Sequence, residues 1–170
     1  MLHYIQQNTL LKYALLGVCF VVLFFVGYIR DYVFVNINYE LIDIYYKRNE
    51  WQMPANLSYF EHWDYARLYY FKYTLTALFV FLYLGVSLAS VTLLFKPKKY
   101  LLYTAIAYLT VVVVAYALNN THLLGIDGRQ AYLFSRELMG FVQSPFIFIV
   151  LISVFFLAEK QELLVSVNKA

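Results

Sequence analysis

The sequence predicts an all-α integral membrane protein in which four transmembrane helices form a bundle. Of its 170 residues, 63% are hydrophobic and only 14% are charged, whereas soluble domains carry roughly 25% charged residues. One small folded core cannot bury so much apolar surface, and lipid can cover it instead. Four stretches, residues 13–29, 73–95, 100–118 and 138–158, contain no charged residue and no histidine.

Each stretch approaches or exceeds the roughly 20 residues that a helix needs to cross the hydrocarbon of a bilayer. Lipid offers the backbone no hydrogen-bond partners, so helices are expected, and four segments are too few for a closed barrel. We therefore expect a single membrane domain over residues 1–170, with spans at about residues 11–29, 73–95, 100–118 and 138–158.

The first span could be mistaken for a signal peptide, because Lys12 precedes its apolar run. The run is long for such a peptide, and residues 27–30 offer no small-residue cleavage motif. We expect a retained anchor.

Orientation follows from Lys96, Lys98 and Lys99, which crowd the short connection between the second and third spans. Short basic loops stay in the cytoplasm, so both termini are expected there. The outer loops are then residues 30–72 and 119–137. All five arginines and eight of the ten acidic residues fall on this outer side.

The first outer loop shows helical periodicity over residues 33–46, where apolar residues alternate with Asn, Glu and Asp. This pattern predicts an amphipathic helix that lies at the membrane interface. Met53-Pro54 then interrupts the pattern. Ser58 and Glu61 have the spacing of a capping box, which predicts a helix that begins at Tyr59 and continues to Phe95.

The second outer loop contains Asp127-Gly128, a dipeptide typical of turns. We expect the last helix to begin near this point and to bend at Pro145, because proline lacks the amide hydrogen that a helix interior requires.

The candidate functional residues are arginines and acids near the outer ends of three spans: Arg30, Asp31, Glu61, Asp64, Arg67, Arg136 and Glu137. Arginine forms two-pronged hydrogen bonds with carboxylates, and partial burial strengthens such pairs. The residues are expected at similar depth at the outer boundary. They are either ion pairs that fix helix register or a surface that binds another membrane protein.

The sequence gives little support for catalysis, metal binding or nucleic-acid binding. Cys19 has no charged or histidine neighbour in its own span, and His62 has no second histidine nearby for a metal site. The net charge of +3 is too small to suggest nucleic acid. We predict no enzyme activity and no cofactor. A small transporter or channel subunit is the alternative, although the spans lack the ionisable residues that ion pathways use.

Five short motifs follow one another along the chain in three stretches. Arg30-Asp31-Tyr32-Val33-Phe34 closes the first span. Met53-Pro54 precedes Lys72-Tyr73-Thr74-Leu75, and Leu133-Phe134-Ser135-Arg136-Glu137 precedes Gln143-Ser144-Pro145. In this order they resemble the small membrane proteins that accompany exosortase F-type sorting systems in Bacteroidota. Glu137 stands where that family has a second arginine, and the first outer loop is longer here.

The resemblance implies a non-catalytic accessory or scaffold subunit in the bacterial inner membrane. Its partner would be an exosortase-like enzyme, which acts on exported proteins at the outer face of that membrane.

Overall fold

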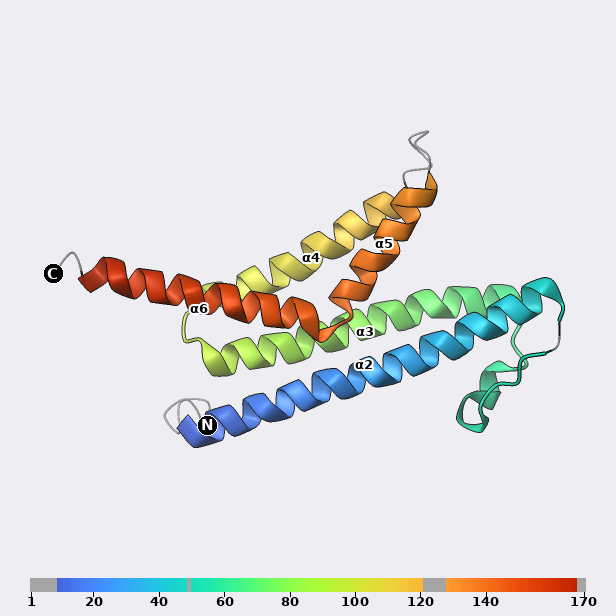
Figure 1. Ribbon diagram of the computed structural model, residues 1–170, viewed down its shortest axis with the longest axis horizontal. Coiled ribbons are helices and arrows are strands. Elements are labelled where there is room, and N and C mark those ends of the chain that lie inside the picture. The colour runs from blue at the N-terminus through green and yellow to red at the C-terminus, as the bar shows by residue number, and fades with distance from the viewer. Residues whose placement is uncertain (1–8, 49, 121–127, 168–170) are drawn as a thin grey trace. The chain divides into compact units, whose positions relative to one another are not determined.

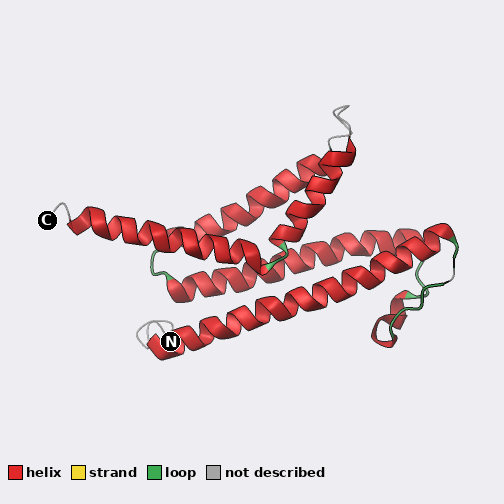
Figure 2. Cartoon of the chain, in the orientation of Figure 1, coloured by secondary structure: helices red, strands yellow, loops and turns green. Residues whose placement is uncertain are grey.

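The computed structural model describes residues 9–48, 50–120 and 128–167, and every regular element within them is a helix (Figure 1, Figure 2). In chain order the elements are α2 (Thr9–Tyr46), the 3₁₀ helix η1 (Ala55–Phe60), α3 (Tyr65–Leu94), α4 (Lys99–Asn119), α5 (Gly128–Val142) and α6 (Pro145–Val167). The all-α prediction is confirmed.

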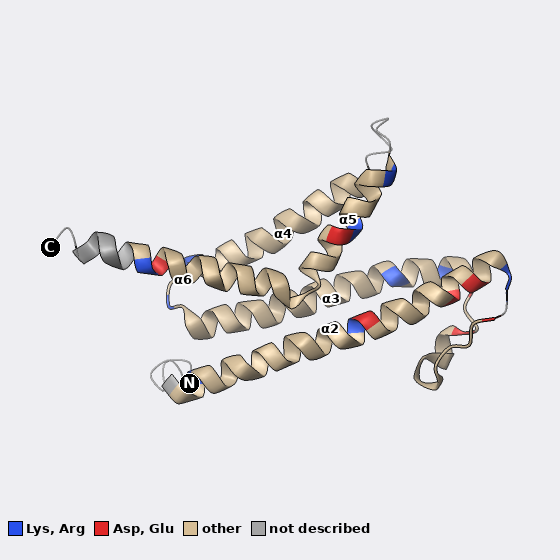
Figure 3. Ribbon diagram, viewed as in Figure 1, with Lys and Arg blue, Asp and Glu red and all other residues tan. Residues whose placement is uncertain are grey.

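Helices α2, α3 and α4 are long and apolar enough to cross a membrane, and the bent pair α5 and α6 provides a fourth span if it is counted as one. Long stretches of these helices carry no Lys, Arg, Asp or Glu (Figure 3). Many of their large apolar side chains are exposed, including Val21, Phe81 and Leu109. Such a surface requires lipid around it, so the chain is a multi-pass membrane protein.

Helix α2 joins two elements that the sequence analysis separated. Residues 33–46 are helical as predicted, but they continue the first span, so the prediction of a separate interfacial helix is wrong. Residues 30–33 contain no glycine or proline that would interrupt the helix. The 38 residues of α2 extend for about 57 Å, and those after Arg30 continue beyond the charge-free stretch of residues 13–29.

Helix α2 ends in a Schellman motif. Lys47 adopts a left-handed backbone conformation with φ of 54°, a position that glycine usually occupies. The amides of Lys47 and Arg48 donate to the carbonyls of Ile44 and Asp43, at 3.3 and 3.2 Å. These bonds end the helix and reverse the chain, so that Met53 packs against Ile37 and Leu41 in one core cluster.

The predicted capping box is wrong. The Ser58 hydroxyl donates to the carbonyl of Ala55 at 3.0 Å, inside η1. Helix α3 begins at Tyr65, and the Asp64 carboxylate accepts the amide of Arg67 at 3.2 Å. Asp64 is therefore the residue that caps α3, because an N-cap acceptor satisfies an amide of the first turn.

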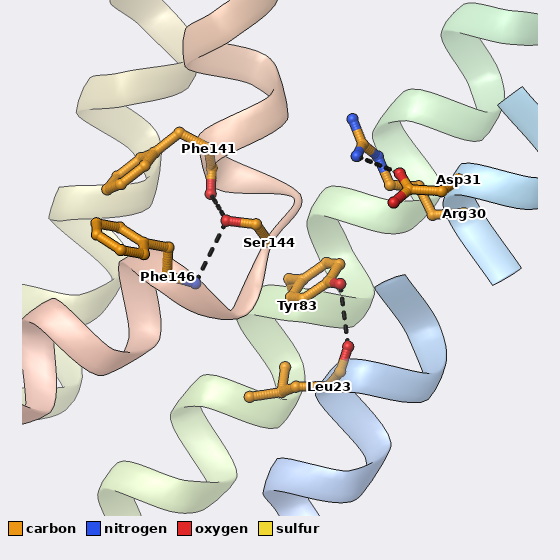
Figure 4. Close-up of polar contacts among 7 residues, drawn as sticks. All are labelled: Leu23, Arg30, Asp31, Tyr83, Phe141, Ser144 and Phe146. Carbon is orange, nitrogen blue, oxygen red and sulfur yellow. Dashed lines mark hydrogen bonds and ion pairs between the residues drawn. The ribbon is translucent and has the colours of Figure 1, made fainter. Parts of the chain in front are cut away.

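The last span begins at Gly128 and bends at Pro145, as predicted, while Asp127 lies outside the described residues. The bend is a break of 67° between α5 and α6, so the predicted span of residues 138–158 consists of parts of two helices. The Ser144 hydroxyl donates to the carbonyl of Phe141 at 2.7 Å and accepts the amide of Phe146 at 3.3 Å (Figure 4). Ser144 thus satisfies backbone groups at both sides of the break.

The chain divides into two compact units, each with its own apolar core. We call Phe24–Leu82 the loop unit, and the described residues up to Leu23 together with those from Tyr83 onward the bend unit. The buried core of the loop unit consists of Ile37, Leu41, Met53, Leu57 and Leu68. That of the bend unit includes a cluster of Val91, Phe95, Tyr100 and Phe155.

Candidate partner-binding surface

Arg30 and Asp31 form an ion pair of 2.7 Å between neighbouring residues of α2 (Figure 4). The Arg30 guanidinium also lies 5.7 Å from the centre of the Phe34 ring. The Arg30 side chain is only 23% exposed, whereas that of Asp31 is 69% exposed. The pair therefore presents its carboxylate, rather than its guanidinium, to the surroundings.

Contacts inside the loop unit show which part of α3 lies beside this ion pair. The Lys72 ammonium donates to the Asn38 side chain at 2.6 Å, and the rings of Phe34 and Phe79 are 5.9 Å apart, so the two helices run antiparallel. Arg30 precedes Asn38 by eight residues, which is about 12 Å along a helix. The ion pair consequently lies beside the charge-free stretch of α3 that follows Lys72.

Asp64 and Arg67 lie near the opposite end of the loop unit. The ring of Tyr65, next to Asp64, is 6.0 Å from that of Tyr45, near the end of α2. Tyr45 follows Arg30 by 15 residues, or about 22 Å along the helix. The prediction that these arginines and acids share one depth is therefore wrong for the first two spans.

The remaining predicted residues have local contacts. The Arg67 guanidinium lies 4.2 Å from the centre of the Trp63 ring, a cation–π geometry. Glu61 follows η1, and its amide donates to the carbonyl of Ser58 at 3.1 Å. In the bend unit, α5 carries Arg136, 6.0 Å from the Tyr132 ring, and Glu137. The contacts that the structure records for these side chains are thus not ion pairs between helices.

A buried polar stripe on α2 was not predicted. Asn36, Glu40 and Asp43 are each at least nine-tenths buried, although the sequence analysis placed them on the polar face of an interfacial helix. The Asp43 carboxylate accepts the amides of Glu50 and Trp51, at 3.0 and 3.3 Å. These bonds attach the loop to the helix. The four- and three-residue spacing of the stripe was visible in the sequence, but the side that it faces was not.

Glu40 is the least satisfied member of the stripe. Among the described residues, its buried Oε2 atom has no hydrogen-bond partner.

Exposed tyrosines form a second feature of the loop unit. The rings of Tyr65 and Tyr69 stack at 5.9 Å, and the hydroxyls of Tyr69 and Tyr73 are 2.9 Å apart. Together with Tyr45 these rings follow one another along the helix pair. Tyrosine is enriched both in membrane interfaces and in protein interfaces, because its ring is apolar and its hydroxyl is polar.

The described part of the chain contains no group of three or more His, Cys, Asp or Glu residues that could hold a metal ion. Comparisons with protein families, characterised proteins and solved structures found no match to this chain.

Proposed function

We propose that the chain is a non-catalytic accessory subunit of an exosortase-type protein-sorting system in the bacterial inner membrane. In this role it binds another integral membrane protein through its outer arginines and acids. We further propose that both termini are cytoplasmic and that the loop of the loop unit is on the outer side, as the lysines between α3 and α4 favour.

One observation carries the binding role. The Asp31 carboxylate is 69% exposed in the chain alone, yet it lies beside the charge-free stretch of α3. An ionised side chain at hydrocarbon depth costs several kcal/mol unless protein or water surrounds it. Arg30 balances the charge of Asp31, and a second membrane protein that covers the exposed side of this pair would remove the cost that remains. The motif order described above favours an exosortase-like enzyme as that protein.

The binding role is tested by co-purification from native membranes with a tagged chain, followed by mass spectrometry of the retained proteins. Asp31→Arg should lose a membrane-embedded transpeptidase-like partner, while Glu50→Arg, which reverses another exposed acid of the loop unit, should retain it. Arg67→Glu and Arg136→Glu test the other predicted residues and should weaken retention less, because aromatic rings already contact both guanidinium groups. Unchanged retention with Asp31→Arg would contradict the proposal.

The orientation has its own test. A cysteine introduced at Glu50 should react with a membrane-impermeant maleimide added to the outside of intact inner-membrane spheroplasts, whereas one introduced at Lys98 should react only after lysis. Cys19→Ser removes the native thiol beforehand. The reverse labelling pattern would overturn the proposed orientation.

A further inference from the structure

Five lysines gather at one end of the bend unit. The ring of Phe95, which follows α3, is 5.0 Å from that of Phe156 in α6. The ring of Tyr100, in the first turn of α4, is 4.8 Å from that of Phe155. The end of α3, the start of α4 and this part of α6 therefore meet. We call this end of the bend unit the lysine end, and its lysines are Lys12, Lys96, Lys98, Lys99 and Lys160 (Figure 3).

Few acidic residues balance these lysines. The sequence contains no Asp or Glu from residue 65 to residue 126, so the connection between α3 and α4 carries three positive charges and no negative one. Helix α6 contributes Glu159 and Glu162. The exposed lysines of this end are Lys96, Lys98 and Lys160, and no ion pair is recorded for them within the described part of the chain. The lysine end therefore has an excess of positive charge.

A groove lies along α6 at the same end. It has a volume of about 650 Å³, within the range of small-molecule sites, and is lined by Ser153, Phe156, Leu157, Glu159 and Lys160. Its two large apolar members belong to the charge-free stretch of residues 138–158, and its two ionic members follow that stretch. The lining thus changes from apolar to ionic over about 10 Å of helix. This change places the groove at the boundary between hydrocarbon and headgroups.

The size and chemistry of the groove select its occupant. Two helical turns offer far less surface than the roughly 800 Å² per partner that a stable protein interface buries. A phospholipid matches the lining, because its acyl chain is apolar and its headgroup is polar at the depth where the ionic residues begin. The excess of lysine favours a negative headgroup, since basic pockets at the ends of transmembrane helices bind anionic lipids.

Two of the exposed lysines are placed to share one headgroup. Lys96 directly follows Phe95, and Lys160 lies one turn after Phe156, about 6 Å further along α6. Because the two rings are 5.0 Å apart, the two flexible lysine side chains start close together from different segments. Phosphate oxygens accept strong hydrogen bonds from ammonium groups, so one phosphate can join both lysines.

We infer that the lysine end binds one anionic phospholipid. An acyl chain lies in the groove against Phe156 and Leu157, and the headgroup phosphate lies between Lys96 and Lys160. This inference goes beyond the proposed function and depends neither on it nor on the orientation of the chain, because headgroups line both faces of a bilayer.

Native mass spectrometry of the full chain in detergent tests the charge contact. The purified chain is mixed with equal amounts of phosphatidylglycerol and phosphatidylcholine that carry the same acyl chains, and the retained lipids are counted. One phosphatidylglycerol should be retained, with a preference of about 25-fold over phosphatidylcholine, because each of two lysines contributes about fivefold. Lys96→Gln combined with Lys160→Gln should remove the preference.

The matched control is Lys47→Asn combined with Arg48→Gln, which removes two exposed positive charges at the other end of α2 from Lys12. Asparagine tolerates the left-handed backbone of position 47. The preference should change by less than about twofold, because distant charges are screened. Lys96→Arg combined with Lys160→Arg keeps both charges and should keep the preference.

The groove has a separate test. Leu157→Trp fills the groove and leaves both lysines in place, so it should lower the retention of phosphatidylglycerol by at least half. Leu109→Trp, the same substitution at a leucine of α4 that is 63% exposed where Leu157 is 64% exposed, should leave retention unchanged.

Three results would overturn the inference: equal retention of the two lipids, an equal loss of preference in the lysine pair and the control pair, or unchanged retention in Leu157→Trp. The first two would show that the lysine end selects no headgroup, and the third that the lipid lies outside the groove. Co-purification of a protein partner is measured independently, so the proposed function stands or falls separately.

Discussion

The bend unit and the loop unit differ in the polar groups that connect their segments. In the bend unit hydroxyls predominate: Ser135 donates to the carbonyl of Ala115 at 2.7 Å, and Tyr83 to that of Leu23 at 3.1 Å (Figure 4), alongside the Lys12 ammonium, which donates to the carbonyl of Leu94 at 3.2 Å. In the loop unit they include the Asp43 carboxylate and the Lys72 ammonium.

The difference follows from the cost of burying each group. A hydroxyl that finds a backbone carbonyl can be buried in lipid at little cost, and such bonds contribute about 0.6 kcal/mol on average. A charged group costs more to bury but forms stronger hydrogen bonds, of about 1.5–3 kcal/mol. We therefore expect single substitutions of polar groups to have larger effects in the loop unit. Trp51 and Trp63, the two tryptophans of the chain, both lie there, so tryptophan fluorescence reports on the loop unit.

The largest effect is expected in the apolar core of the loop unit. Leu68 is fully buried there, and Leu68→Ala should lower the free energy of unfolding by about 3 kcal/mol, because it removes buried methyl groups and leaves a cavity. Thermal denaturation in detergent, followed by tryptophan fluorescence, measures the loss. Leu78→Ala, which truncates a half-exposed leucine of the same helix, should cost about 0.5 kcal/mol or less. Equal losses at the two positions would mean that Leu68 is not part of a packed core.

The next largest effect tests the attachment of the loop to α2. Asp43→Ala should lower stability by about 2 kcal/mol, because the amides of Glu50 and Trp51 lose a charged acceptor. Asp43→Asn, which keeps one oxygen acceptor, should lose about half as much. Denaturant titration followed by tryptophan fluorescence measures both variants. If Asp43→Ala lowered stability no more than Tyr83→Phe, described below, polar groups would contribute equally in the two units.

The smallest effect is expected in the bend unit. Tyr83 is fully buried, and Tyr83→Phe removes only the hydroxyl that bonds to the carbonyl of Leu23. The free energy of unfolding should fall by about 0.6 kcal/mol, the average for a hydrogen bond between membrane helices. Loss of helical circular dichroism on heating measures this change. A loss of unfolding free energy above 2 kcal/mol would mean that a single polar group stabilises the bend unit as much as one does in the loop unit.

The amino-acid sequence alone determined the class of the protein and most of its helices. Charge-free stretches of about 20 residues have no stable form in lipid other than a helix, so both ends of α4 and the last turn of α3 were predicted to within one residue. The start of α3 was not, because it lies at Tyr65 rather than at the predicted Tyr59. Pro145 likewise marked the break between α5 and α6, because its missing amide hydrogen and its ring act locally.

The tertiary structure decided which side of each helix is buried and where α2 ends. Asn36, Glu40 and Asp43 have the same spacing whether they face water or the returning loop, and only the packing of Met53 and Leu57 against α2 turns them inward. The separation of Arg30 and Arg67 along the helix axes likewise depended on which residues of α2 and α3 pack against each other. Burial and register arise from contacts between residues far apart in the sequence, and the periodicity of one segment carries no information about those contacts.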